Sequence, residues 1–243
     1  VLVLAVLLGG PAALTLDGHG ARYFSADLRT ATGAWRSYTL DDGSIIALDS
    51  GSAVNLHFDA RQRAVELVQG GIRVTVAKDA SRPFVVTTPQ GEMRALGTRF
   101  LVEREDGATI LSMLESKVAA RAAQDPRGVV VQAGERVRIT ERSIGPLQAI
   151  SAAGADAAWQ QHKLAVEDRP LTEVLAQLGR YRTGHIAFDA AQLQGIRVSA
   201  VLPLDDTDRA LQLLLNNFPQ LRVRRLTPYW VMVDAPPQEN SKK

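Results

Sequence analysis

The sequence predicts a multidomain fold, with an all-β domain over residues 33–140 and a small α+β domain over residues 159–234. In the first region, short apolar segments recur every ~8–12 residues with turn residues between them, a spacing typical of all-β domains. In the second region, two segments place apolar residues at helical spacing. The length of 243 residues suits two domains, because a domain usually has ~100–150 residues.

The chain begins with an apolar segment. Residues 1–16 carry no charge and open on Val-Leu-Val-Leu-Ala-Val-Leu-Leu. Because a membrane-spanning helix needs ~20 apolar residues, this segment predicts the C-terminal part of a transmembrane helix, followed by a juxtamembrane segment over residues 17–32. A signal peptide and a buried core helix are the alternatives. The membrane span and the signal peptide both imply that the rest of the chain is exported.

The all-β domain is predicted from strands that turn residues separate. Turn signals stand at Asp41-Asp42-Gly43, Ser50-Gly51-Ser52, Gly70-Gly71, Pro89-Gln90-Gly91 and Asp106-Gly107. Several of the segments between them alternate apolar and polar residues, which predicts strands with one buried face. The expected strands are residues 44–48, 54–58, 64–68, 72–76, 84–86, 93–96, 100–102, 109–114, 129–131 and 136–139.

Two segments are expected to lie outside the domains. Residues 141–158 contain Gly145-Pro146 and a small-residue run from Ser151 to Ala155, which predict a linker. Residues 235–243 are polar and predict a disordered tail.

The second domain is predicted to have the order β-α-β-β-α-β-β, with two helices over one small sheet in two layers. Asp168 is expected to cap the first helix, with Pro170 in its first turn, and Asp205 or Asp206 to cap the second. Strands are expected at residues 163–166, 186–188, 196–202, 221–226 and 229–233. One face of each helix is apolar: Leu171, Val174, Leu175 and Leu178 in the first, and Ala210, Leu211, Leu214, Leu215 and Phe218 in the second.

Composition and motifs argue against a conventional enzyme. Lys and Arg number 28 and Asp and Glu 26, so the basic surface of a nucleic-acid-binding protein is not expected. The chain has no cysteine, and no histidine has a partner at a metal-ligand spacing. The nucleophile elbow and the phosphate-binding loop are also missing. We therefore expect no conventional catalytic residue, no cofactor and no nucleic-acid partner.

A late strand carries the candidates for a partner-binding surface. Arg222 and Arg224 share one face of it, where they could contact an acidic partner or face solvent. Tyr229 and Trp230 follow, and alternation predicts one ring inside the domain and one outside. An exposed ring is typical of interface anchors, although a core position for either ring is the alternative.

Four motifs resemble the FecR family, which comprises single-pass inner-membrane anti-sigma regulators of bacterial iron uptake. They occur in the family's order over residues 33–140. The motifs are Leu40-Asp41-Asp42-Gly43-Ser44, Val65-Glu66-Leu67 before Gly70, Arg82-Pro83-Phe84-Val85-Val86 and Leu96-Gly97-Thr98-Arg99-Phe100. The chain departs from the family at Gly71-Ile72-Arg73-Val74, where Gly-Glu and an aromatic residue are usual, and at Glu115-Ser116, where Gly often follows the Glu.

Residues 159–233 resemble the short secretin/TonB N-terminal domain, or STN domain, which is known at the C-terminus of such regulators. The resemblance rests on the order of the elements and on Pro170-Leu171-x-x-Val174-Leu175. It implies an STN-like domain as the second domain of this chain.

The resemblance implies a function in cell-surface signalling. An outer-membrane TonB-dependent receptor binds a ferric siderophore, and its signalling domain contacts the periplasmic part of the regulator. Periplasmic and intramembrane proteases then cut the regulator, and a cytoplasmic piece is released with its extracytoplasmic-function sigma factor. Residues 1–16 would anchor this chain in the bacterial inner membrane, with the rest in the periplasm. The alternative is a structural or cell-wall-binding envelope module without sigma-factor regulation.

Some family members also break at the Gly-Thr bond of the last motif, which makes Gly97 and Thr98 candidates for a single self-cleavage. A Thr hydroxyl can attack the preceding carbonyl and move the acyl group from nitrogen to oxygen. Gly97 leaves that carbonyl unscreened and tolerates strained backbone angles. A hydroxyl is a weak nucleophile without a base, and the sequence identifies none. The alternative is that Gly97 serves a bend and Thr98 begins a strand.

Overall fold

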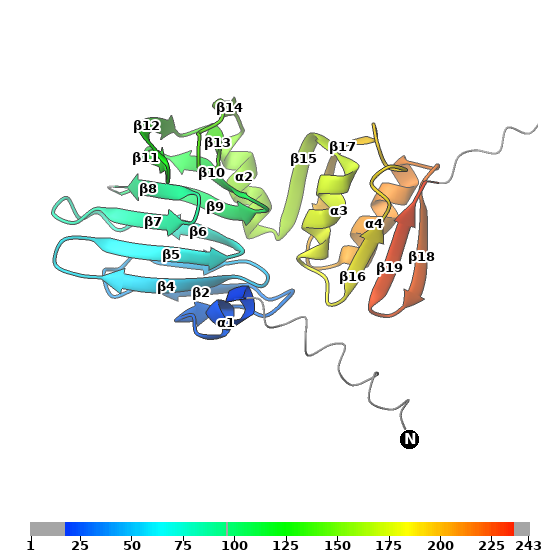
Figure 1. Cartoon of the computed structure of the whole chain (residues 1–243), viewed down its shortest axis with the longest axis horizontal. Helices are drawn as coiled ribbons and strands as arrows, with labels where there is room; N and C mark the ends of the chain where they lie inside the picture. Colours follow the sequence, from blue (N-terminus) through cyan, green and yellow to red (C-terminus); the bar gives the residue numbers. More distant parts are fainter. Residues whose placement is uncertain (1–17, 96, 236–243) are drawn as a thin grey trace, which may run out of the picture. The chain divides into compact units, whose positions relative to one another are not determined.

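The structure, a computed structural model (Figure 1), describes residues 18–95 and 97–235. These residues divide into two compact units. The first contains residues 18–30 and 35–149, and the second contains residues 31–34 and 150–235.

The first unit contains two seven-stranded sheets. One of them has the order β1-β4-β5-β7-β8-β11-β12 and is antiparallel except for the parallel pair β5–β7. Its strands, several of which lie side by side in Figure 1, are β1 (Leu28–Arg29), β4 (Ala53–Phe58), β5 (Arg63–Gln69), β7 (Phe84–Thr88), β8 (Gly91–Ala95), β11 (Lys117–Ala122) and β12 (Asp125–Gln132).

The other sheet has the order β14-β13-β10-β9-β6-β3-β2 and is antiparallel throughout. A short helix, α1 (Gly18–Phe24), precedes the first strand of the unit, and its Arg22 forms an ion pair with Glu66 of β5. The strands of this sheet are β2 (Arg36–Thr39), β3 (Ile45–Leu48), β6 (Gly71–Thr75), β9 (Arg99–Glu105), β10 (Ala108–Glu115), β13 (Glu135–Ile139) and β14 (Gln148–Ala149).

One apolar core joins the two sheets. Val65 and Val86 come from the first sheet and Val74 and Leu111 from the second, and all four are fully buried in the same cluster. Alternate residues of each strand point into this cluster, because successive side chains of a strand lie on opposite faces. The unit is therefore a β-sandwich, and the predicted all-β fold is confirmed.

The second unit has the predicted order of strands and helices after one additional helix. β15 pairs with β17, while β16, β19 and β18 form a separate three-stranded sheet in that order. The two later helices contact strands of both small sheets. The elements are α2 (Ala152–Gln160), β15 (Lys163–Pro170), α3 (Leu171–Gly179), β16 (His185–Phe188), β17 (Arg197–Pro203), α4 (Thr207–Asn217), β18 (Arg222–Thr227) and β19 (Trp230–Asp234).

This arrangement corrects the expectation of one sheet under two helices. The strands divide into two small sheets because β15 and β17 pair only with each other among the described strands. The apolar face predicted for α3 is buried as expected, through Leu171, Val174, Leu175 and Leu178. In α4, Ala210, Leu211 and Leu214 are buried, while Leu215 and Phe218 are only partly buried.

The helix caps follow the prediction in α4 and differ from it in α3. Asp206 caps α4, because its side chain accepts a hydrogen bond from the Arg209 amide at 2.9 Å. Asp168 does not cap α3, which begins after Pro170 without a side-chain cap. The backbone of Asp168 instead has a φ of +46°, and its carboxylate forms an ion pair with Arg197.

The segment expected to be a linker, residues 141–158, contains regular structure. It holds β14 and most of α2. Ser151 starts α2, because its hydroxyl accepts a hydrogen bond from the Gly154 amide at 3.0 Å. The small residues that suggested a linker therefore form the first turns of a helix. The tail predicted at residues 235–243 lies outside the described residues from 236 onwards.

Candidate functional site

The predicted self-cleavage residues lie where the chain crosses from one sheet of the sandwich to the other, between β8 and β9. Gly97 has a φ of +125°, which favours glycine. A Cβ atom at this position would also lie 3.3 Å from Cγ of Lys78. The positive φ and the close approach of Lys78 both explain why glycine occupies this position.

Thr98 is buried, and its polar groups are held on both sides. Its hydroxyl donates a hydrogen bond to the carbonyl of Glu115, and its own carbonyl accepts one from the Val76 amide at 2.9 Å. Glu115 follows an irregularity in the pairing of β10 with β9, and the next residue, Ser116, has a φ of +61°. Such a bulge turns a carbonyl out of the regular ladder, and here that carbonyl contacts Thr98.

The chemistry available to Thr98 is that of a positioned hydroxyl. Its proton points to a carbonyl oxygen, so the lone pairs of Oγ1 are left for other contacts. Over residues 18–95 and 97–235, no carboxylate or imidazole forms a hydrogen bond with this hydroxyl. The nearby Glu115 carboxylate is exposed and forms an ion pair with Arg99 at 3.3 Å. In the described part of the chain, the Thr98 hydroxyl is thus held in a fixed orientation, but no general base is hydrogen-bonded to it.

The loop that contacts Gly97 is held by a buried arginine that the sequence analysis overlooked. Arg63 is fully buried and donates to the carbonyl of Ala77 at 3.0 Å and, through Nε and Nη2, to that of Arg82 at 3.1 and 2.9 Å. It also forms an ion pair with Asp42 at 2.6 Å. The sequence does contain a signal for its burial: in β5, Arg63 lies two residues before Val65 and four before Leu67, so alternation places all three side chains on the buried face.

The partner-binding candidates of the second unit come together on the hairpin of β18 and β19. Arg222 and Arg224 share a face as predicted, because both form ion pairs with Asp234 on the neighbouring strand. The Arg222 Nε–Asp234 Oδ1 distance is 2.9 Å. Hydrogen bonds from Arg222 and then Arg224 hold the pKa of the Asp234 carboxyl below its ordinary value. Arg225 lies on the other face and pairs with Asp208 of α4 at 3.1 Å.

Both aromatic rings of this hairpin are exposed, which corrects the prediction that one ring is buried. Tyr229 is 65% exposed and Trp230 is 44% exposed. Tyr229 belongs to the turn, so the alternation of the strand does not reach it, and the inward positions of β19 are taken by Val231 and Val233. Leu226, which the sequence analysis did not single out, is also exposed at this end of β18.

The turn that carries Tyr229 is fixed in place although its side chain is exposed. The Tyr229 carbonyl accepts a hydrogen bond from the His185 amide at 2.7 Å, and its amide donates to the Thr227 hydroxyl at 3.2 Å. Gly184 has a φ of +125°, and a Cβ there would come within 2.3 Å of the same Tyr229 carbonyl. The rings of His185 and Trp230 pack with centroids 4.8 Å apart. The hairpin therefore presents its exposed rings from a rigid backbone.

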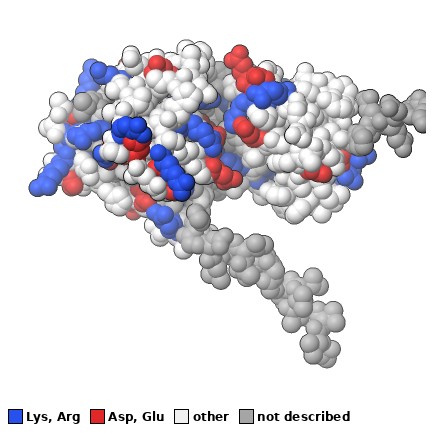
Figure 2. All heavy atoms as spheres, turned by 45° about the horizontal axis from the view of Figure 1, so that its top comes forward, with Lys and Arg blue, Asp and Glu red and all other residues white. Residues whose placement is uncertain are grey.

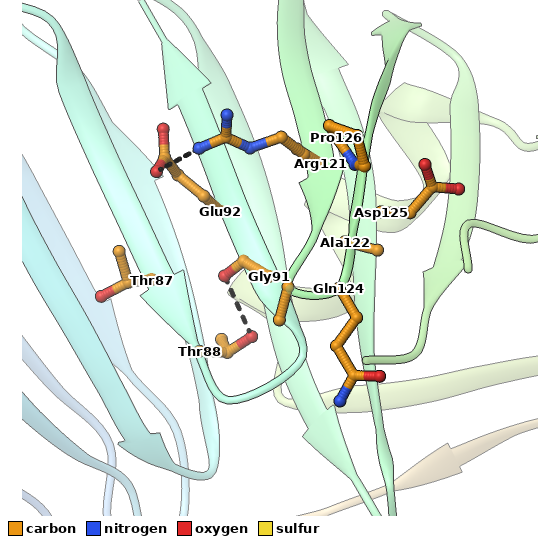
Figure 3. Close-up of a pocket in the computed structure, with 10 residues that line it drawn as sticks. Thr87, Thr88, Gly91, Glu92, Arg121, Ala122, Gln124, Asp125 and Pro126 are labelled. Atoms are coloured by element: carbon orange, nitrogen blue, oxygen red, sulfur yellow. Dashed lines mark hydrogen bonds and ion pairs between the residues drawn. The ribbon is translucent and has the colours of Figure 1, made fainter. Parts of the chain in front are cut away.

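A hollow of about 440 Å³ lies at the end of the first sheet, where the strands β7, β8 and β11 meet the turn before β12 (Figure 3). Glu92 and Arg121, on adjacent strands, form an ion pair at 3.3 Å, and the Thr88 hydroxyl donates to the Gly91 carbonyl at 3.4 Å. A hydrogen bond from Arg127 keeps the pKa of Asp125 below its ordinary value. The Glu92 and Asp125 carboxylates are thus both engaged in ion pairs with arginines.

Figure 2 shows Lys and Arg side chains lying beside Asp and Glu on the face it draws. The described residues contain no group of three or more His, Cys, Asp or Glu that could hold a metal ion. In the same residues no helix is long and apolar enough to cross a membrane. The span predicted for residues 1–16 lies outside the described residues.

Two comparisons with known proteins give matches. Residues 26–119 match the family model of the FecR protein. Two crystal structures of a protein provisionally assigned as an anti-sigma factor from Parabacteroides distasonis ATCC 8503 have a similar fold, with TM-scores of 0.74 and 0.75. Both are 21% identical to this chain, and the alignments cover 85% of this chain and 97% of theirs.

No curated protein matches the chain. The structural likeness, at this low identity, concerns the fold alone. It covers more of the chain than the family match does, so it extends beyond the first unit. Apart from residues 31–34, the match to the family model lies in the first unit, where the four motifs of the sequence also lie. The first unit of the chain therefore contains a region, residues 26–119, that matches the FecR protein family.

Proposed function

We propose that this chain is the periplasmic part of an inner-membrane anti-sigma regulator. The observation that carries the proposal is the FecR match over residues 26–119. The likeness in fold to the Parabacteroides protein, which covers 85% of the chain, supports the same role in signalling. In this proposal residues 1–16 belong to the membrane anchor, and the second unit is an STN-like domain.

The partner in this proposal is the signalling domain of an outer-membrane TonB-dependent receptor for a ferric siderophore. Its binding leads to cleavage of the regulator by periplasmic and intramembrane proteases and so to release of a sigma factor. The hairpin of the second unit supports a binding role, because Tyr229 and Trp230 are exposed on a fixed backbone. Rigid exposed aromatic rings are typical anchors of protein interfaces, since they bury a large area at little cost in entropy.

Calorimetry tests this proposal. The full chain is titrated with the N-terminal signalling domains of TonB-dependent receptors from the same organism, each in turn. We expect one of them to bind, and Tyr229→Ala to weaken binding at least about tenfold, the loss typical of an interface anchor. Val201→Ala is the control, because Val201 is 58% exposed on the other small sheet of the same unit. If no receptor domain gives heat at high concentration, an envelope module without sigma-factor regulation becomes the better description.

A second activity concerns the bond between Gly97 and Thr98. In this proposal Thr98 Oγ1 attacks the Gly97 carbonyl carbon, the C–N bond breaks, and the acyl group moves to oxygen as an ester with a free Thr98 amine. Water then hydrolyses the ester to a Gly97 carboxylate and restores the Thr98 hydroxyl. The positive φ of Gly97 and the fixed Thr98 hydroxyl support this reaction. The chain would act once on itself and would turn over no substrate.

A further inference from the structure

The strand β18 lies at an edge of the three-stranded sheet of the second unit. It pairs on one side with β19, and no strand of the described residues pairs with its other side. Five of its six residues are exposed, and only Val223 is partly buried. An edge strand presents unpaired N–H and C=O groups, which can pair with a strand of another protein. Proteins often screen such edges with charged side chains, and β18 carries three arginines.

The arginines of β18 are drawn back toward their own unit. Arg222 and Arg224 both reach across the sheet face to Asp234 on β19, and Arg225 reaches to Asp208 on α4. Arg222 and Arg224 are thus bonded on the side of β18 that is away from the open edge, and Arg225 is bonded toward α4. The edge backbone of β18 is therefore left accessible to a pairing strand.

The arginines of β18 also determine which charge a partner strand needs in order to pair with this edge. These three arginines pair with two aspartates, and Asp208 also pairs with Arg182 at 2.8 Å, so the local balance of charge is positive. Arg222, Arg224 and Arg225 remain 53%, 51% and 63% exposed. A guanidinium has five N–H donors, and each of these arginines still has donors to offer to a carboxylate. An acidic strand beside β18 would complete this set of ion pairs.

A second copy of this chain is a poor occupant of the edge. Pairing of β18 with β18 would bring the arginines of one copy against those of the other, and like charges on opposed strands are destabilising. Leu226 and Tyr229, both exposed at one end of the strand, add an apolar contact for the end of the incoming segment. The fixed turn means that this contact requires little ordering of the backbone.

We infer that β18 binds an extended acidic strand of the receptor signalling domain by strand addition. This inference rests on the proposed function and specifies how the partner is held. Main-chain hydrogen bonds supply part of the affinity, the arginines select for acidic side chains, and Leu226 with Tyr229 fixes one end of the added strand.

Hydrogen exchange of the full chain, with and without the receptor signalling domain that binds it, tests the inference. We expect the amides of residues 222–227 to become protected on binding. The opposite edge of the same sheet, β16, serves as the internal control and should change little. Binding with unchanged exchange in β18 would overturn strand addition and leave the proposed function standing. If no receptor signalling domain binds the unmodified chain, the proposed function and this inference both fail.

A matched pair of variants tests the selection for acidic partners. Arg222→Gln should weaken binding about tenfold, since charge-assisted hydrogen bonds are the strong ones. Arg197→Gln should not, although Arg197 is similarly exposed, at 52%, and also pairs with an aspartate of the same unit. Equal affinities for the two variants, with thermal melting showing both to be folded, would contradict the proposed role of the arginines.

Discussion

Arg63 and Asp42 form an ion pair inside the sandwich, with the arginine side chain fully buried and the aspartate almost so. Burying two charges is unfavourable unless their remaining donors and acceptors are also bonded. Here Arg63 also donates to the carbonyls of Ala77 and Arg82, and Asp42 accepts from the Ser44 hydroxyl at 2.6 Å. The pair thereby ties the turn before β3 to the loop that contacts Gly97.

Loss of one partner of this pair should destabilise the first unit strongly. Arg63→Met leaves the Asp42 carboxylate buried without its cation, which typically costs about 3–5 kcal/mol. Arg121→Met is the control, because the Arg121–Glu92 pair is exposed and such pairs contribute about 0–1 kcal/mol. Urea unfolding followed by tryptophan fluorescence measures both. Similar free energies of unfolding for the two variants would contradict a structural role for the buried pair.

The same pair predicts a loss of stability in acid. Burial raises the pKa of Asp42, but hydrogen bonds from Ser44 and Arg63 outweigh it, so the pKa lies below its ordinary value of 3.8. A lowered folded-state pKa stabilises the fold above the unfolded value and loses this contribution as the pH falls through the folded value. The free energy of unfolding should therefore decrease below pH ~4. Asp42→Asn should reduce that slope, and an unchanged slope would show that other carboxylates dominate.

Self-cleavage predicts a dependence on the Thr98 hydroxyl. Mass spectrometry of the purified chain should find two pieces that end at Gly97 and begin at Thr98, and Thr98→Ala should remain intact. Thr98→Ser keeps a hydroxyl and should still cleave. Thr109→Ala is the matched control, because Thr109 is another buried threonine with a bonded hydroxyl in the same unit. Only intact unmodified protein, behaving as Thr98→Ala does, would end the proposal.

Gly184 should be essential to the hairpin of the second unit. Gly184→Ala brings a Cβ within 2.3 Å of the Tyr229 carbonyl at a φ of +125°. Strain of this kind costs on the order of 1–3 kcal/mol, which lowers the melting temperature of a domain this small by several degrees. Gly179→Ala is the control, since nothing lies within 4 Å of its Cβ position and the residue ends α3. Equal melting temperatures would show that the hairpin yields without strain.

The periodicity of apolar residues predicted the features that depend on residues close together in the sequence, namely the buried faces of helices and strands. The buried face of α3 follows directly from the spacing of Leu171, Val174, Leu175 and Leu178. The inward side of most strands in the sandwich follows in the same way. β11 was missed, although Lys117–Ala122 alternates between exposed and buried residues. Its inward positions are mostly alanine, which has a low strand propensity and gives a weak signal.

Other features depend on contacts between residues far apart in the sequence. The division of the second unit into two small sheets depends on which strands pair with each other. The apolar pattern of β15 or β17 would be the same with any partner, so it does not predict the pairing. Arg63 looked like an ordinary charged residue, because its partners lie 21 residues before it and 14 and 19 residues after it. The exposure of both Tyr229 and Trp230 depends on where the turn ends, which alternation alone does not fix.

The location of the Gly97–Thr98 bond has a topological consequence. The chain before this bond contributes β8 to one sheet and β6 to the other. The chain after it contributes β11, which pairs with β8, and β9, which pairs with β6. A nick at this bond would therefore leave a split protein whose halves interlock through both sheets and share one core. The halves would separate only if the backbone hydrogen bonds of both the β8–β11 and the β6–β9 ladders were broken. Breaking the bond alone would remove the covalent connection and keep the fold, so the two pieces of a cut chain would stay assembled until both ladders were separated.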